Sequence, residues 1–365
     1  ATGNGLIFST FLGGDSRDIG EDIVLDAAGN YYVTGYTFSE NFPTKNAYQS
    51  DFGGYSDAFI TKLNATGNGL LFCTFLGDDN RDRGLDISID SAGNSYITGD
   101  TNSINFPIVN AYQSAFGGGE SDVFVTKLNA TGNGLLYSTF VGGSNFEFGF
   151  GTVVDDAGHC GVVGFTTSSD FPVANAFQSI YGGGESDAFV LRLDTTDSTL
   201  LFSTFLGGNL ADQGSAIAVD DVGHYYVVGI TYSYNFPVVD AYQGTLNTEG
   251  NDVFAAKLDH SGNLLFSTYF GGLFEELGSD IAVGTNGQFY IAGATFSEDF
   301  PLENAYQTSP QGYYDAFITK FSYDPTSGPT SSPTSTTSTD SFTITIFLIA
   351  TFPLILAIKR RRKVF

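Results

Sequence analysis

Ser9-Thr-Phe-Leu-Gly-Gly14 is the stretch that decides the fold, because related hexapeptides return four more times along the chain. The later copies begin at Cys73, Ser138, Ser203 and Ser267, in steps of 64 or 65 residues. A Phe-Pro pair keeps the same period, with its prolines at Pro43, Pro107, Pro172, Pro237 and Pro301. Self-similarity at a fixed period indicates a repeat architecture, so the 365 residues are not expected to form ordinary separate domains.

Each repeat predicts four β-strands. In the first full repeat, residues 22–26 form a short apolar run, and residues 31–37 are rich in β-branched and aromatic side chains. A loop of about twenty residues then leads to expected strands at 57–63 and 70–76. No segment of the repeat has helical periodicity. Four antiparallel strands in a repeat of this size are typical of one propeller blade.

The two ends of the repeat region predict a closed ring. Residues 6–12 have the sequence of a fourth strand with no blade before it, and residues 315–321 have that of a third strand with no fourth strand after it. Pairing the two would complete a blade and remove exposed strand edges. We therefore expect an all-β fold over residues 1–323: a β-propeller of five four-stranded blades, closed by its N- and C-terminal strands.

The composition changes sharply after the last repeat. Residues 324–341 are rich in Ser, Thr and Pro and predict an extended stalk. Residues 342–358 are uncharged and predict one transmembrane helix, followed by a basic tail at 359–365. Because positive charges remain on the cytoplasmic side, this order predicts a single-pass protein of the cell surface with an extracellular propeller and a cytoplasmic C-terminus.

The charge balance restricts the partners. The chain has 40 acidic and 14 basic residues, and five of the basic residues lie in the tail at 359–363. Binding to nucleic acid needs clustered Lys and Arg, so nucleic acid is a poor partner, whereas cations and basic ligands suit such a surface. An alternative is that the acidic charge serves solubility alone. Five basic residues share one repeat position, where we expect ion pairs with the acids, such as Asp57, that open the same strands: Lys62, Lys127, Arg192, Lys257 and Lys320.

The repeat motif resembles a known family. Its characteristic elements are Ser-Thr-Phe-Leu-Gly-Gly, Ala28-Gly-Asn-Tyr-Tyr-Val-Thr-Gly35, Asn41-Phe-Pro43, Ala47-Tyr-Gln49 and Asp57-Ala-Phe-Ile-Thr-Lys-Leu63. Together they are similar to the SBBP (β-propeller) repeat family over about residues 5–323. The resemblance implies a propeller on an extracellular or surface protein of bacteria or archaea, and implies no known reaction. The stalk, apolar segment and basic cluster likewise resemble the surface anchors of prokaryotes, archaea among them.

One acidic position recurs in every copy of the loop that joins two blades. If the ring closes, these five carboxylates come close together at the mouth of the central channel, where like charges are unfavourable without a cation. Oxygen-rich sites of this kind suit Ca²⁺. The alternative is that each acid accepts backbone N–H bonds from its own turn or from the next blade. The five acids are Asp18, Asp82, Glu147, Asp212 and Glu276.

The long loops after the second strands are the expected recognition surface, because loops on rigid scaffolds commonly carry function. Residues present in every copy are expected to pack blades together, so the positions where copies differ are the better ligand contacts. These positions are Glu40, Ile104, Ser169, Tyr234 and Glu298. Asn64 and Asn129 begin sequons for N-glycosylation in turns, a short signal that also arises by chance.

Enzyme chemistry finds little support in the sequence. The three histidines lie in turns, and no Ser-His-Asp, Cys-His or zinc spacing is present. Five-bladed propellers can be glycosidases, but catalysis by two carboxylates needs two different environments, and five equivalent acids form a symmetric ring. We therefore expect a monomeric, membrane-anchored binding or adhesion module for an extracellular glycan or protein, and no enzyme. The alternatives are an envelope component bridged by divalent cations and a surface glycosidase.

Overall fold

The computed structural model describes residues 4–247, 250–284 and 287–323, and these contain 19 β-strands. The strands are β1 Asp18–Leu25, β2 Tyr31–Thr37, β3 Asp57–Leu63, β4 Leu70–Leu76, β5 Asp82–Ile89, β6 Ser95–Thr101, β7 Asp122–Leu128, β8 Leu135–Val141, β9 Glu147–Val154, β10 His159–Thr166, β11 Asp187–Asp194, β12 Thr199–Leu206, β13 Asp212–Val219, β14 Tyr225–Thr231, β15 Asp252–Leu258, β16 Leu264–Phe270, β17 Glu276–Val283, β18 Gln288–Thr295 and β19 Asp315–Ser322.

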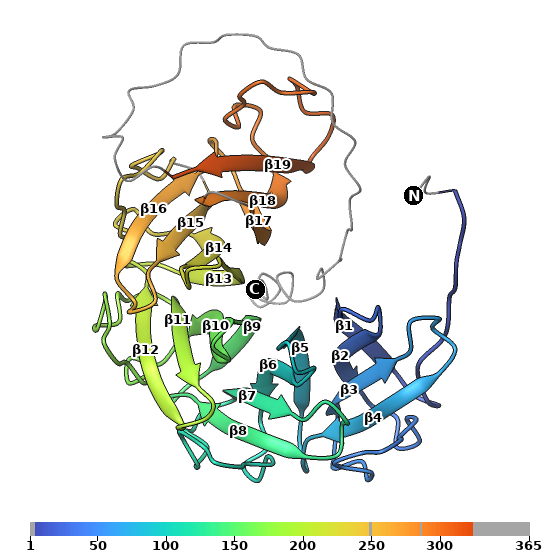
Figure 1. Ribbon diagram of the computed structural model, residues 1–365. Helices are drawn as coiled ribbons and strands as arrows, with labels where there is room; N and C mark the ends of the chain where they lie inside the picture. The colour runs from blue at the N-terminus through green and yellow to red at the C-terminus, as the bar shows by residue number, and fades with distance from the viewer. Residues whose placement is uncertain (1–3, 248–249, 285–286, 324–365) are drawn as a thin grey trace, which may run out of the picture.

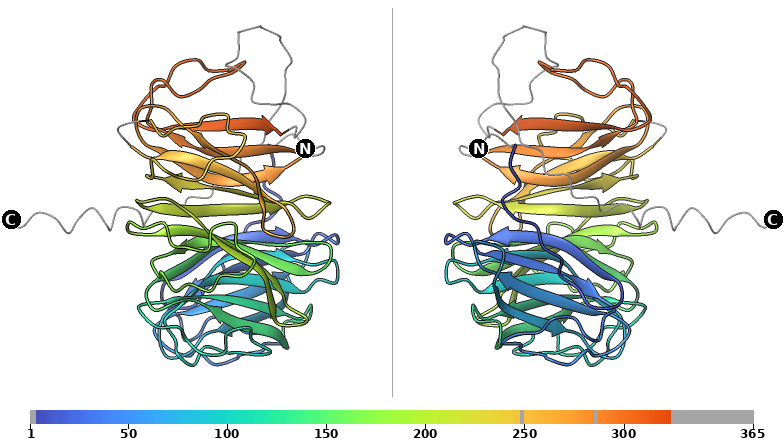
Figure 2. Two further views of the ribbon diagram at one scale, coloured as in Figure 1. Left: turned by 90° about the vertical axis from the view of Figure 1, so that its left-hand side faces the viewer. Right: turned by 90° about the vertical axis from the view of Figure 1, so that its right-hand side faces the viewer.

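The strands form five separate antiparallel sheets, which we number as blades 1 to 5 in chain order. Blades 1 to 4 have four strands each, and blade 5 has three. In Figure 1 the first strand of every blade (β1, β5, β9, β13 and β17) lies nearest the centre, and the sheets fan outward from it. Figure 2 shows the turns and loops gathered at the two ends of the strands. The expected all-β, propeller-like architecture is confirmed for the described residues.

The strand bounds of blade 1 agree with the sequence for β2, β3 and β4, but the inner strand begins at Asp18 rather than at residue 22. A β-bulge between Gly20 and Asp22 inserts Glu21 into that strand, and the inner strand of every other blade carries a bulge at the equivalent place. A bulge adds one residue without a partner on the neighbouring strand. The short apolar run at 22–26 therefore accounts for only part of the inner strand.

The Phe-Pro marker packs within its own blade. Phe42 is buried, and its ring lies 4.6 Å from the ring of Phe59 on β3. The same pair recurs in the other blades at 4.6–4.7 Å: Phe106 with Phe124, Phe171 with Phe189, Phe236 with Phe254 and Phe300 with Phe317. Beyond this pair the long loop of blade 1 runs back along β4 and forms bridges at Cys73 and Phe75. The loop thereby covers the edge of the outer strand.

The hydrophobic cores lie between neighbouring blades. Ile87, Ile217 and Ile281 occupy one position of the inner strands of blades 2, 4 and 5, and each is at most 9% exposed. Each packs against the preceding blade, for example Ile87 with Ile60 of blade 1. Ile23 at the same position of blade 1 is 49% exposed. Burial of these faces therefore depends on the presence of a preceding blade.

The expected closure of the ring is not present in this structure. Among residues 4–323 with their two gaps, blade 5 has no strand after β19, and residues 6–12 form no strand. Ile7 and Phe11 are almost fully exposed, whereas the ring of Phe8 packs 5.0 Å from that of Tyr31, and Leu12 packs against the core of blade 1. These two contacts tie the N-terminal segment to its own first blade, and in Figure 1 the rest of the segment runs outward from that blade, apart from β19.

The expected stalk at 324–341, transmembrane helix at 342–358 and basic tail at 359–365 lie outside the described residues. Within the described part of the chain, no helix is long and apolar enough to cross a membrane.

We predict that Phe171→Ala will destabilise the propeller by about 3–5 kcal/mol, because it removes a buried ring from the stacked pair. Phe177→Ala is the matched control in the same loop, since Phe177 is 45% exposed, and we expect a change within about 0.5 kcal/mol. Urea unfolding of both variants measures the difference. Equal losses for the two variants would contradict this account of the Phe-Pro marker.

Candidate functional site

Two sets of loops meet at one end of the strands, which we call the loop face. The inter-blade loop before β1 donates hydrogen bonds to the loop after β2: Asp15 N–H to Asn41 Oδ1 at 3.0 Å and Ser16 N–H to Ser39 Oγ at 2.9 Å. Equivalent bonds tie the loops of blades 3, 4 and 5. The expectation that both kinds of loop lie on one face is therefore correct.

The five copy-specific positions lie on these tied loops. All five side chains are exposed, and each precedes the Asn or Asp that begins the Phe-Pro segment: Glu40, Ile104, Ser169, Tyr234 and Glu298. The structure thus presents four kinds of side chain at the same place on the five blades, with Glu in blades 1 and 5. Nothing brings the five into contact with one another.

The recurrent inter-blade acids are buried rather than open to solvent. Asp82, Glu147, Asp212 and Glu276 are fully buried, and only Asp18 of blade 1 is partly exposed. Asp82 accepts hydrogen bonds from Thr101 Oγ1, from Ser103 Oγ at 2.8 Å and from the N–H of Asp78 at 2.9 Å. The alternative in which each acid binds its own turn describes these contacts. Among the described residues, no group of three or more His, Cys, Asp or Glu is placed to hold a metal ion.

A second acid approaches each of these carboxylates from the preceding blade. The four inter-blade pairs are Asp57 with Asp82, Asp122 with Glu147, Asp187 with Asp212 and Asp252 with Glu276. Burial raises the pKa of Asp57 and Asp212 to about 6, and that of Asp82, Asp122, Asp187 and Asp252 to about 7. The charge of the partner adds to the rise for Asp82, Asp122, Asp187 and Asp252.

The basic residues of the third strands pair with other acids than expected. Lys62 Nζ lies 3.2 Å from Asp26, at the end of the inner strand, and Arg192 Nη2 lies 2.7 Å from Asp155. Asp57 opens β3, whereas Lys62 stands one residue before its end, so the two are at opposite ends of the strand. The ion pairs therefore fasten the face opposite the loop face.

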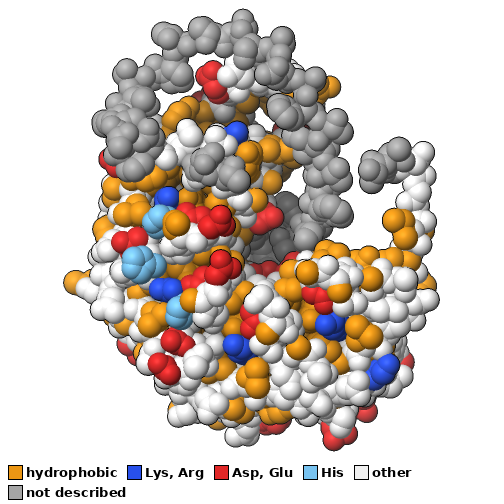
Figure 3. Space-filling model, in the orientation of Figure 1, with side chains coloured by type: hydrophobic (Ala, Val, Ile, Leu, Met, Phe, Trp, Pro, Cys, Tyr) orange, Lys and Arg blue, Asp and Glu red, His pale blue; other side chains and the backbone are white. Residues whose placement is uncertain are grey.

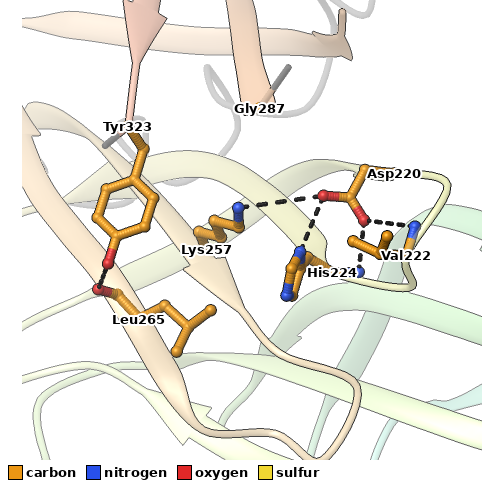
Figure 4. Close-up of a pocket in the computed structure, with 7 residues that line it drawn as sticks. All are labelled: Asp220, Val222, His224, Lys257, Leu265, Gly287 and Tyr323. Carbon is orange, nitrogen blue, oxygen red and sulfur yellow. Dashed lines mark hydrogen bonds and ion pairs between the residues drawn. The ribbon is translucent and has the colours of Figure 1, made fainter. Parts of the chain in front are cut away.

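That opposite face carries the histidines and a small cavity (Figure 3). The cavity, of about 380 Å³, lies between blades 4 and 5, and Asp220, His224, Lys257 and Tyr323 line part of it (Figure 4). His224 Nδ1 lies 2.9 Å from Asp220 Oδ2. In blade 1 an asparagine amide makes the equivalent contact, from Asn30 to Asp26 at 2.8 Å. His224 thus replaces a scaffold residue.

The structure brings together three acids that the sequence reasoning missed. Asp22 on β1, Asp86 on β5 and Asp280 on β17 each follow the bulge of an inner strand. The carboxyl of Asp22 lies close enough to that of Asp86 to act on it. Burial, together with the charge of Asp22, raises the pKa of Asp86. Burial also raises the pKa of Asp280, and the charge of Asp22 adds to it. The other two blades have Gly151 and Ala216 at this position.

A polar and aromatic cluster lies nearer the loop face, on the inner strands of blades 1 to 3 and on the second strands β2 and β6. Arg83 Nε donates to buried Asp100 at 2.9 Å, and its guanidinium lies 4.7 Å from the ring of Phe148 and 5.9 Å from that of Tyr36. Burial raises the pKa of Glu21, while the positive charges of Arg83 and Arg17 oppose the rise. We call Glu21, Tyr36, Arg83, Asp100, Phe148 and Phe150 the inner cluster.

The inner cluster is copy-specific. Phe150, which is partly exposed, is the bulge residue of blade 3, and its ring lies 5.4 Å from that of Phe148. The bulge residue is Glu21 in blade 1 and Leu85 in blade 2. Aligning the five repeats shows these differences in the sequence, but only the fold places them beside one another.

The two sequons lie in turns, as expected. Asn64 and Asn129 are partly exposed, and the amide of each donates at 3.1 Å to the side chain of an asparagine four residues later. Both side chains therefore already stabilise the turns between third and fourth strands.

Comparison with known proteins confirms the repeat family for one stretch of the chain. Residues 76–107, which run from the end of β4 through β6, match the model of the SBBP family, described as a β-propeller repeat. The regulatory protein FlaEY of Caulobacter vibrioides is 29% identical over 142 residues, which are 39% of this chain. The match spans only 14% of the length of that relative.

Solved structures that align with this chain do so at low sequence identity and low TM-score. A protein of unknown function from Dyadobacter fermentans has 8% identity and a TM-score of 0.45, over 79% of each chain. A xylan β-1,4-xylosidase from Bacillus halodurans has 12% identity and a TM-score of 0.32, over 85% of this chain and 53% of its own. Enzymes and a protein of unknown function both occur among these matches, which at such TM-scores carry no argument about function.

We predict that Asp86→Asn will raise the melting temperature at pH 8 and leave it nearly unchanged at pH 4. An acid whose pKa is raised on folding binds more protons in the folded state, so stability falls as pH rises above the unfolded value of about 4. The asparagine side chain does not ionise, so the Asp86→Asn variant does not lose this stability as the pH rises. Melting curves between pH 4 and pH 8 measure the effect, with exposed Asp156→Asn as the control. A pH-independent difference between wild type and Asp86→Asn would contradict the assignment.

Proposed function

We propose that this protein is a cell-surface binding module that recognises an extracellular glycan through the loop face and the inner cluster behind it. One observation carries the proposal: the side chains that differ between blades are gathered on one face and around one centre. The scaffold supplies the same loop five times, and the copy-specific residues give each blade a different chemistry.

The chemistry of the inner cluster suits a ligand rich in hydroxyl groups. The partly exposed carboxylate of Glu21 offers directional hydrogen bonds, and the partly exposed rings of Tyr36 and Phe150 offer apolar faces for a sugar. Buried Arg83 and Asp100 support them from behind.

Further aromatic side chains extend toward the loops. The ring of exposed Tyr55 packs 5.4 Å from that of Phe38, and the ring of Phe296 packs 6.0 Å from that of exposed Tyr313. Charge and aromatic surface therefore occur together, as in a carbohydrate-binding surface.

The short distance between Asp22 and Asp86 favours binding of a glycan over its hydrolysis. The two carboxyls of a glycosidase are about 5 Å or more apart, so that the sugar or a water molecule fits between them. Asp22 and Asp86 instead lie close enough to interact directly with each other. Their environments do differ, since Asp22 accepts the N–H of Ile87 and Asp86 that of Thr152. A surface glycosidase remains the second candidate on that ground alone.

The membrane anchor belongs to the same proposal. The uncharged stretch at 342–358 and the basic residues after it support a single helix that holds the propeller outside the cell on a Ser/Thr/Pro-rich stalk. An exposed terminal tag and a tag within the propeller, probed on intact and on permeabilised cells, would test this orientation.

We predict that the full-length chain will bind a restricted set of neutral or basic glycans on a glycan array. Phe150→Ala and Glu21→Gln should each weaken that binding at least about tenfold, because they remove an aromatic face and a charged acceptor from the inner cluster. Tyr234→Ala tests the loop positions separately. Retained affinity in all three variants, or an array with no bound glycan, would overturn the proposal. Release of sugar from a bound glycan would favour the glycosidase.

A further inference from the structure

The inter-blade pairs defined above leave negative charge buried without a positive partner. None of the ion pairs among the described residues includes any of their eight carboxylates. The charged groups that act on them are further acids, such as Asp78 beside Asp57 and Asp170 beside Glu147. Two carboxylates in this situation need a counter-charge, because burial penalises each of them and they repel each other.

The buried oxygens also lack hydrogen-bond donors. Asp57, Asp122 and Asp187 are fully buried, and in each the Oδ1 atom has no hydrogen-bond partner. Their Oδ2 atoms are well satisfied: Asp122 Oδ2 accepts the N–H of Gly117 at 2.7 Å, and Asp57 Oδ2 accepts that of Gly53 at 2.8 Å. The Oδ1 atom of this aspartate therefore has no hydrogen-bond partner at three successive junctions between blades, from blade 1 to blade 4. A repeated, buried and unpartnered carboxylate oxygen points to a ligand rather than to a local irregularity.

The free oxygen faces the acid of the next blade across a glycine. A Cβ atom on Gly77 would lie 2.6 Å from Asp82 Oδ2 and 2.9 Å from Asp57 Oδ1. At Gly271 the corresponding distances are 2.5 Å to Glu276 Oε2 and 2.6 Å to Asp252 Oδ1. Both oxygens therefore lie against the same glycine and close to each other, an approach that a larger side chain would block.

We propose that each of the four inter-blade pairs binds one cation, and that Ca²⁺ is the ion that fits best. The donors are all oxygens, which a hard cation prefers, and two carboxylates balance its charge. Ca²⁺ accepts six to eight oxygen ligands in flexible geometry, so water can complete the coordination left by the two carboxylates. The strongly acidic composition of the chain suits such ions. This proposal is independent of the glycan ligand.

The recurrent glutamine of the Ala-(Tyr/Phe)-Gln marker holds the site in shape. Gln49 Nε2 donates to Asp57 Oδ2 at 3.0 Å, and its Oε1 accepts the N–H of Gly77 at 3.1 Å. Gln113, Gln178 and Gln243 make the same two contacts in their own blades. The glutamine amide thereby holds the aspartate through its Oδ2 atom and holds the backbone of the glycine. The Oδ1 atom of the same aspartate is left for the ion.

Titration of the full-length chain with CaCl₂ at pH 7.5 tests the proposal. We expect calorimetry to give four Ca²⁺ per chain, and the melting temperature to rise by roughly 5 °C or more over that in chelator. Asp122→Asn should bind three, because it removes one carboxylate charge of the second pair. It should also melt at a higher temperature than wild type in chelator, because the uncompensated repulsion is gone.

Glu120→Gln is the matched control: it removes one charge from an exposed side chain of the same loop, and we expect four Ca²⁺ and an unchanged melting temperature. Absence of both heat and thermal shift with Ca²⁺ would overturn the proposal. A melting temperature that rises on acidification in chelator but does not change with Ca²⁺ would also overturn the proposal, because the carboxylate pairs would then bind protons instead of the ion. Four Ca²⁺ bound by Asp122→Asn would overturn the assignment of these residues.

Discussion

The arrangement of the blades depends on the bridge that one glutamine makes in each of blades 1 to 4. Its amide nitrogen donates to the aspartate that opens the third strand, and its amide oxygen accepts the N–H of the glycine that follows the fourth strand. The long loop, the third strand and the passage to the next blade are thereby fixed at one point. Because this glycine passes close to carboxylates of both blades, no larger residue fits there without displacing them. Blade spacing is therefore set by polar contacts, while the apolar faces between blades supply the bulk of the burial.

The residues that recur between the blades and the residues proposed to bind the glycan are different sets. Much of what recurs is accounted for by packing: the Phe pair in all five blades, and in blades 1 to 4 the glutamine bridge and the ion pair between the third-strand Lys or Arg and an acid. What differs is gathered at the exposed loop positions and around the centre. The three central acids illustrate the point, because they occupy one repeat position that two blades fill with Gly151 and Ala216. A ring of similar blades thus builds an asymmetric centre from a symmetric plan.

The repeat, the strand pattern and the sharing of one face by two sets of loops could be predicted from sequence, because they follow from local periodicity and turn chemistry. The surroundings of single side chains could not. Asp82 was expected at an open channel mouth, but Thr101 and Ser103 on the next strand draw it into the interior. Lys62 was assigned to an acid at the far end of its own strand, because the sequence does not show which inner-strand residue lies beside it. Closure failed for a different reason: residues 6–12 match a fourth strand in sequence, yet the apolar surface of blade 1 competes for Phe8 and Leu12.

The bulge in every inner strand has a consequence for how such a protein diversifies. The inserted residue has no partner on the neighbouring strand, so cross-strand pairing does not restrict which side chain can stand there. Glutamate, leucine, phenylalanine and serine all occupy it in this one chain, at Glu21, Leu85, Phe150, Ser215 and Ser279. Mutation at these five places can alter the lining of the centre while the register of every strand is kept. Ligand specificity can therefore change by substitution of the bulge residues without any change in the fold.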